Sequence, residues 1–107
     1  MSYKRESPEK IQSLMNEKDV ILIDVRSAQE IKSDGCISKS LNIDIRGSDF
    51  EDKLKALDKT KTLVLYCRAG NRSATAAQEA IDCGFTDVYM IEGGITGWKS
   101  RGLSVEK

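Results

Sequence analysis

Short runs of apolar residues alternate along the chain with segments in which apolar residues recur every three or four positions. Runs of the first kind are typical of buried strands, and the second spacing is typical of helices that cover a sheet. The pattern predicts strands at residues 20–24, 40–45, 62–66 and 87–91. It predicts helices at residues 8–16, 28–33, 49–57, 73–83 and 95–101. The strand at 40–45 alternates weakly, with Leu41, Ile43 and Ile45 on one face, so one of its sides is expected to be less buried.

Strands and helices alternate throughout, with no repeat and no linker. This order predicts an α/β fold with a mostly parallel central sheet and helices on both faces. One domain is expected over residues 1–107, with its core at about 7–102. In such sheets, ligands bind at the carboxyl ends of the strands. Asp24 and Arg26 come at the end of the first predicted strand, and Cys67 follows the third.

The composition is that of a globular domain without net charge. Of the 107 residues, 39% are apolar and 32% are charged, and 17 acidic residues balance 17 basic ones. This balance gives no field that would favour nucleic acid or a membrane surface as a partner. No apolar run approaches the ~20 residues of a membrane-spanning helix. The first ten residues lack the apolar stretch of a secretory signal, so a cytoplasmic location is expected.

Three cysteines and no histidine restrict the chemistry that the chain can perform. Cys36, Cys67 and Cys83 are widely spaced and form no Cys-x-x-Cys pair, so no zinc site is expected. Without histidine, neither a cysteine nor a serine can be paired with an imidazole base. A reactive cysteine must then be activated by positive side chains, backbone N–H groups or a helix N-terminus.

The segment after the third predicted strand supplies all of these features around Cys67. Gly70 lets the chain curl, so that successive N–H groups can point inward at an anion. A helix is expected to begin near Ser73 as its N-cap, and Arg68 and Arg72 add positive charge nearby. Each feature favours the thiolate, so the pKa of Cys67 is expected to lie below its usual ~8.5. A cation is unfavourable near a helix N-terminus, so Arg72 indicates that an anion lies beside it.

Four sequence motifs follow one another along the chain. They are Asp24-Val25-Arg26 with Glu30, Gly35-x-Ile37 to Asn42-Ile43, Cys67-Arg68-Ala69-Gly70-Asn71-Arg72-Ser73, and Glu92-Gly93-Gly94-Ile95-x-x-Trp98. In this order they resemble the motifs of the rhodanese family, the single-domain thiosulfate or polysulfide sulfurtransferases. The resemblance extends from about Ser7 to Gly102, which is nearly the whole chain.

The resemblance implies an enzyme, a sulfurtransferase that works without a cofactor or a metal. Cys67 would take sulfur from thiosulfate or a polysulfide, hold it as a persulfide, and pass it to an acceptor such as cyanide or a thiol. Small donors and acceptors are thus the expected partners, and a protein sulfur acceptor is an open alternative. Cys67 is expected to be the catalytic nucleophile, and Asp24 and Arg26 are expected to support it. The expected substrate-binding residues are Arg68, Ala69, Gly70, Asn71, Arg72 and Ser73.

The chain departs from the family pattern around the second motif. Cys36 stands in place of a histidine, Lys39-Ser40 in place of a Gly-Ala pair, and Asp44 in place of a proline. These positions bear on docking surfaces and partner choice rather than on residues 67–73, the nucleophile loop. Cys36 is either inert or a second thiol that resolves the Cys67 persulfide into a disulfide.

Two other functions remain open. Dual-specificity phosphatases and some arsenate reductases of related fold attack an oxyanion with a cysteine loop. Their signature has one residue more than the four that separate Cys67 from Arg72, and this loop has no acidic residue to protonate a leaving group. The second alternative is a regulatory or sulfur-carrier module acting with a protein partner. The presence of Cys67 favours catalysis over a purely regulatory role.

Overall fold

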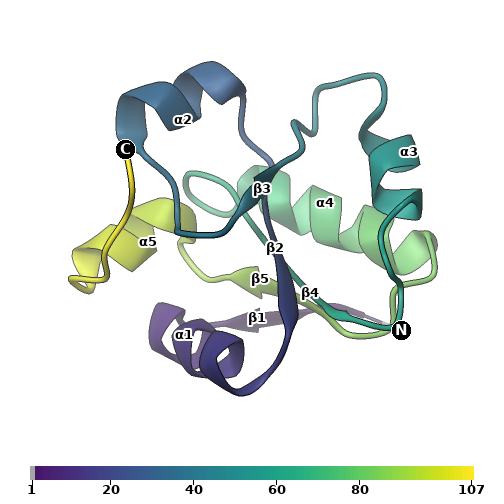
Figure 1. Ribbon diagram of the computed structural model, residues 1–107, viewed down its shortest axis with the longest axis horizontal. Coiled ribbons are helices and arrows are strands. Elements are labelled where there is room, and N and C mark those ends of the chain that lie inside the picture. Colours follow the sequence, from purple (N-terminus) through teal and green to yellow (C-terminus); the bar gives the residue numbers. More distant parts are fainter. Residues whose placement is uncertain (1) are drawn as a thin grey trace.

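The centre of the molecule is a sheet of five parallel strands, drawn in Figure 1. The computed structural model describes residues 2–107, and its strands are β1 (Lys4–Glu6), β2 (Val20–Asp24), β3 (Leu41–Asn42), β4 (Thr62–Tyr66) and β5 (Val88–Ile91). They lie in the order β1-β5-β4-β2-β3. The helices are α1 (Pro8–Glu17), α2 (Ala28–Asp34), α3 (Phe50–Lys55), α4 (Asn71–Asp82) and α5 (Gly94–Ser100). The predicted α/β class with a parallel sheet is confirmed.

Helices cover both faces of the sheet, because successive residues of each strand point to opposite sides. On one face, Leu63 and Leu65 of β4 pack into a cluster with residues of α3 and α4. On the other face, Val64 and Tyr66 pack with residues of α1 and α5. α2 has no buried residue and lies at the top of Figure 1, beyond the carboxyl end of β2. Within residues 2–107, no helix has the length and apolar character needed to cross a membrane.

Local capping signals place the first two helices close to their predicted positions. Ser7 caps α1 by accepting a hydrogen bond of 3.2 Å from the N–H of Lys10, and Pro8 is the first helical residue. α2 begins with a capping box: the Ser27 hydroxyl accepts from the N–H of Glu30, and the Glu30 carboxylate accepts from the N–H of Ser27. The capping box holds the Glu30 carboxylate at the start of α2.

The two edge strands differ from the sequence prediction. β1 was not predicted, because an edge strand pairs through its backbone with a single neighbour and needs no apolar pattern. The strand expected at 40–45 shrinks to Leu41–Asn42, and Leu41 is exposed while Ile43 is buried. The expectation of a continuous strand over 40–45 is therefore wrong, and Leu41 and Ile43 differ in burial. The N–H groups of Ile43 and Ile45 still bond to the carbonyls of Asp24 and Val25 beside the end of β2.

Candidate active site

Cys67 lies just beyond the carboxyl end of β4, enclosed by the loop that follows it. Its exposed fraction is only 1%. The Sγ atom lies 3.1 Å from the backbone nitrogen of Gly70, 3.3 Å from that of Ser73 and 3.5 Å from the Ser73 hydroxyl oxygen. The loop therefore forms a donor ring around the sulfur, made of two backbone N–H donors with the Ser73 hydroxyl beside them, and such an arrangement stabilises a small anion.

Gly70 makes this ring possible because its φ is 115°, in the left-handed region that favours glycine. α4 begins directly afterwards at Asn71, so the N–H groups of its first turn face Cys67. The prediction that Ser73 caps this helix is wrong, because Gly70 occupies the N-cap position. Ser73 is fully buried in the first turn instead, where its hydroxyl lies 3.2 Å from the Gly70 carbonyl oxygen and also contacts Sγ.

Two opposing influences set the pKa of the Cys67 thiol. Burial raises this pKa, but the hydrogen bonds to Sγ outweigh burial, and the pKa falls below the usual value for cysteine. The donors are the Ser73 hydroxyl and the backbone N–H groups of Ser73, Gly70 and Arg72. The loop and the helix N-terminus thus favour the thiolate without any base.

Replacing Ser73 by alanine is expected to raise the pKa of Cys67, because the thiolate loses its hydroxyl donor while its burial persists. A raised pKa leaves less thiolate at neutral pH, so alkylation of Cys67 by iodoacetamide should be several-fold slower there. At strongly alkaline pH both proteins should react at the same rate. Peptide mass mapping distinguishes Cys67 from Cys36 and Cys83. An unchanged dependence of the alkylation rate on pH would show that the Ser73 hydroxyl does not lower the pKa of Cys67.

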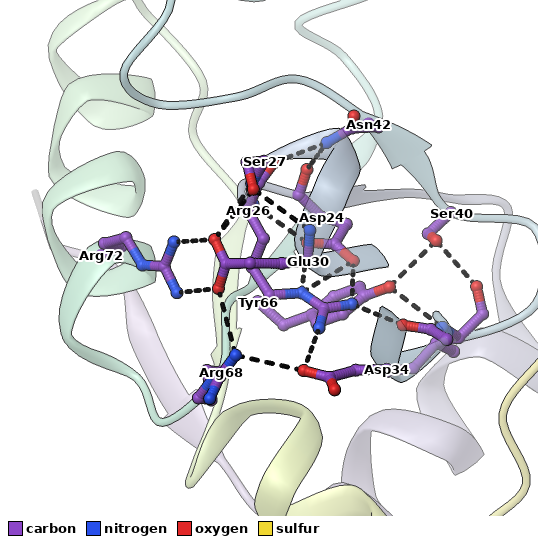
Figure 2. A network of polar contacts seen from close by, with 12 residues as sticks. Asp24, Arg26, Ser27, Glu30, Asp34, Ser40, Asn42, Tyr66, Arg68 and Arg72 are labelled. Atoms are coloured by element: carbon purple, nitrogen blue, oxygen red, sulfur yellow. Dashed lines mark hydrogen bonds and ion pairs between the residues drawn. The ribbon is translucent and has the colours of Figure 1, made fainter. Parts of the chain in front are cut away.

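Both arginines of the loop are paired with carboxylates of α2, as Figure 2 shows. Arg72 donates to both oxygens of Glu30, with Nη1–Oε1 at 2.6 Å and Nη2–Oε2 at 2.8 Å. Arg68 is more exposed, and its Nη2 lies 3.2 Å from Asp34 and 3.7 Å from Glu30. The anion that the position of Arg72 indicated is thus present within the chain as Glu30. The hydrogen bonds from Arg72 are the main reason that the pKa of Glu30 falls to about 2.

Asp24 and Arg26 form a fully buried ion pair beneath α2. Arg26 Nη2 donates to Asp24 Oδ2 at 2.7 Å and to the Gly35 carbonyl at the end of α2, also at 2.7 Å. The Asn42 side chain donates to the backbone carbonyls of Asp24 and Arg26 at 3.0 and 2.8 Å. This network ties both ends of the segment that carries Glu30 to the end of β2. No solvent reaches either side chain, so the supporting role expected for Asp24 and Arg26 stays a prediction that their burial favours.

The start of α5 supports the loop from a second direction. The N–H groups of Ile95 and Thr96 donate to the carbonyls of Cys67 and Arg68 at 2.9 and 3.1 Å. A Cβ atom on Gly94 would overlap both of these carbonyl oxygens, and its φ of 61° is left-handed as well. In the sequence this glycine-rich motif contributes only to the family resemblance, and no local pattern predicts that it holds the nucleophile loop.

The residues of the second motif that depart from the family pattern are accommodated in different ways. Lys39, in place of glycine, adopts φ 69°, a region that costs an ordinary residue about 1 kcal/mol. Ser40 donates its hydroxyl to the Ile37 carbonyl at 2.7 Å and accepts from the Tyr66 hydroxyl at 3.0 Å. Cys36 forms two backbone hydrogen bonds of 2.7 Å with Glu106 and is a free thiol. Whether Cys36 resolves a persulfide stays a prediction.

A pocket of about 300 Å³ lies beside the nucleophile loop. Its lining combines the loop with the start of α4, with β1, and with the end of β5 and the residues after it: Arg5, Ala69, Gly70, Asn71, Ala74, Met90, Glu92 and Gly93. A larger hollow of about 380 Å³ lies between α3 and α4 and contains none of the predicted site residues. The loop pocket therefore places Ala69 and Asn71 at a surface that a small molecule can reach.

Comparisons with known proteins agree with this architecture. The model of the rhodanese-like domain family matches residues 7–101. The thiosulfate sulfurtransferase GlpE of Pseudomonas savastanoi pv. phaseolicola is 37% identical over 98 residues, which cover 92% of this chain and 89% of that protein. Two solved structures are similar over most of their length. A rhodanese-related protein of Thermoplasma volcanium is 30% identical, with a TM-score of 0.84 and coverage of 96% of this chain and 97% of that one.

The second is a Rhodopseudomonas palustris protein of unknown function, described as a "Possible Tyrosine Phosphatase". It is 28% identical, with a TM-score of 0.80 and coverage of 97% of this chain and 85% of that one. The family match covers well over half of the chain, and the curated relative exceeds 30% identity over nearly its whole length. The chain therefore belongs to the rhodanese family, and it is a transferase enzyme of that family.

Proposed function

We propose that this protein moves a sulfane sulfur from thiosulfate or a polysulfide, through a persulfide on Cys67, to a thiophilic acceptor such as cyanide or a thiol. The observation that carries the proposal is the ring around Sγ, in which the N–H groups of Gly70 and Ser73 donate to the sulfur and the Ser73 hydroxyl oxygen lies 3.5 Å from it. The similarity to a protein named as a thiosulfate sulfurtransferase supports the same donor class.

In the first half-reaction the Cys67 thiolate attacks the outer sulfur of thiosulfate. A new S–S bond forms to Cys67, the old S–S bond breaks, and sulfite leaves with the bonding electron pair. The terminal sulfur of the persulfide then carries the negative charge. The loop N–H groups stabilise that charge, because they are already oriented and need no rearrangement.

In the second half-reaction the acceptor attacks the terminal sulfur, and the Cys67 thiolate leaves. With cyanide the product is thiocyanate; with a thiolate it is a new persulfide. Neither half-reaction needs a proton acceptor, provided that Cys67 starts as a thiolate. This explains how the site can work in a chain that contains no histidine.

The loop residues have different proposed roles. The backbone of residues 69–73 binds the anionic sulfur, and the Ser73 side chain adds a hydroxyl donor. Arg68 and Arg72 attract the anionic sulfur donor, but Asp34 and Glu30 reduce this attraction because their carboxylates offset the positive charge of the two arginines. Asp24 and Arg26 act as supports that fix the end of β2 and do not contact the substrate.

Phosphate transfer is the less favoured alternative. Four residues separate Cys67 from Arg72, and the Arg72 guanidinium that would bind a phosphate oxygen is engaged by Glu30. No acidic residue stands in the loop to protonate an alkoxide leaving group. We therefore expect no hydrolysis of p-nitrophenyl phosphate.

Intact mass spectrometry after treatment with thiosulfate or polysulfide tests the proposal. We expect a gain of one sulfur, ~32 Da, that cyanide removes with release of thiocyanate. Peptide mapping should place the added sulfur on Cys67 rather than on Cys36 or Cys83. If no sulfane donor produces the adduct, the persulfide mechanism is wrong; an adduct on another cysteine would reassign the nucleophile.

A further inference from the structure

Glu30 contacts the nucleophile loop through Arg72, and it takes no part in the bond-making steps of the proposed sulfur transfer. Its carboxylate receives two hydrogen bonds from Arg72, at 2.6 and 2.8 Å. The Ser27 backbone N–H and hydroxyl oxygen both lie 3.2 Å from Oε1 on the other side. The side chains of Glu30 and Arg72 are 21% and 23% exposed, so the pair is partly shielded from water. The carboxylate is therefore held in one position by α2 and by the loop together.

Acidic and basic side chains balance around the site. The guanidinium groups of Arg26, Arg68 and Arg72 pair with the carboxylates of Asp24, Glu30 and Asp34. Figure 2 draws these contacts as dashed lines. An anion that enters the donor ring meets backbone N–H groups, but the nearby guanidinium charge is already compensated. The electrostatic advantage that two loop arginines would give an anionic donor is thereby reduced.

We infer that Glu30 is a positioning residue that sets donor preference: by pairing with Arg72, it weakens the binding of a doubly charged sulfur donor relative to a singly charged one. The inference rests on the proposed sulfur transfer for its reaction and on the Glu30–Arg72 geometry for its direction. A singly charged donor of the same chemistry is a thiosulfonate, in which an organic group replaces one charged oxygen of thiosulfate.

The charge of the sulfur donor decides how strongly its binding depends on Glu30. An uncompensated guanidinium attracts a dianion about twice as strongly as a monoanion at the same distance. Removing the negative charge of Glu30 should therefore favour thiosulfate more than methanethiosulfonate. Because the pKa of Glu30 is about 2, its carboxylate is charged throughout the neutral pH range, and the preference should not change there with pH.

The test is the KM of Glu30→Gln for thiosulfate and for methanethiosulfonate, at low ionic strength and with cyanide as acceptor. We expect the thiosulfate KM to fall about fivefold more than the methanethiosulfonate KM, and high salt to reduce the difference. Glu30→Asp keeps the charge and should keep the wild-type ratio. The matched control is Glu51→Gln, which removes the same charge from an exposed pair with Lys55 on α3 and should leave both KM values unchanged.

An equal change of both KM values, or a lower kcat with an unchanged KM ratio, would overturn the inference and leave Glu30 a purely structural role. A second measurement needs no sulfur transfer: sulfate, a dianion without a transferable sulfur, should protect Cys67 from iodoacetamide at lower concentration in Glu30→Gln than in the wild type. If sulfate shows this difference while neither donor forms a persulfide, the proposed function fails and the role of Glu30 in anion binding stands. If persulfide forms, but Glu30→Gln changes neither the ratio of the two KM values nor the sulfate concentration that protects Cys67, the inference alone fails.

Discussion

Cys67→Ser is expected to abolish sulfur transfer, with kcat/KM lower by at least ~10³-fold. An oxygen at this position cannot form the S–S bond of the persulfide. A serine hydroxyl also stays protonated among the same donors, because the chain has no histidine to act as a base. The substitution changes the side-chain volume little, so the melting temperature should stay close to that of the wild type. Thiocyanate formation and intact mass together measure the loss.

Cys83→Ser and Cys36→Ser are the matched controls for that loss. Cys83 lies in the hollow between α3 and α4, where burial raises its pKa and keeps it a thiol. Both variants should retain wild-type turnover and wild-type persulfide yield. Substantial activity in Cys67→Ser, or its loss in Cys83→Ser, would contradict the assignment of the nucleophile. A persulfide that survives much longer in Cys36→Ser would identify Cys36 as a resolving thiol.

Gly94→Ala is expected to damage stability and catalysis together. The new Cβ atom would overlap the carbonyl oxygens of Cys67 and Arg68, which accept the hydrogen bonds that start α5. Neither backbone can move without displacing the donor ring around Sγ. We expect the free energy of unfolding to fall by about 2–4 kcal/mol. We expect kcat of the folded fraction to fall at least ~10-fold, because catalytic geometry tolerates little displacement.

Gly102→Ala separates steric overlap from backbone strain. Gly102 also has a left-handed φ, 77° against 61° for Gly94, but a Cβ atom there would meet nothing within 4 Å. This variant should lose only about 1 kcal/mol of stability and none of its activity. Urea unfolding and steady-state kinetics on both variants make the comparison. Equal losses in the two proteins would show that Gly94 matters for its φ alone and not for its contact with the loop.

The accuracy of the sequence predictions follows how each element is buried. β2 and β4 lie between two helical layers, so they must be apolar at nearly every position, and their sequences show it. β1 pairs with one neighbour and has an exposed polar sequence, so nothing in its pattern distinguishes it from an irregular polar terminus. β3 is two residues long and shows too little alternation to define its ends.

The error at the start of α4 has a similar origin. Ser73 has the residue type of an N-cap, but a glycine with positive φ can begin a helix without a side-chain cap, and Gly70 does so. Its φ of 115° depends on the loop closing around Sγ, which a local pattern does not reveal. The signal available in the sequence was the glycine at this position, which correctly indicated a tight curl.

The order of residues by itself determined the α/β class through the alternation of strands and helices, and the family through the resemblance of four motifs. It also determined the candidate nucleophile, because a buried strand that runs into Cys67 and a glycine three positions later are local features. The same order left the electrostatics of the site undetermined. Glu30 and Arg72 are 42 positions apart, and they meet only because α2 and the nucleophile loop come to the same edge of the sheet. Only the tertiary structure could decide that the loop arginines are already paired, since Coulomb interactions depend on distance in space and not on distance along the chain.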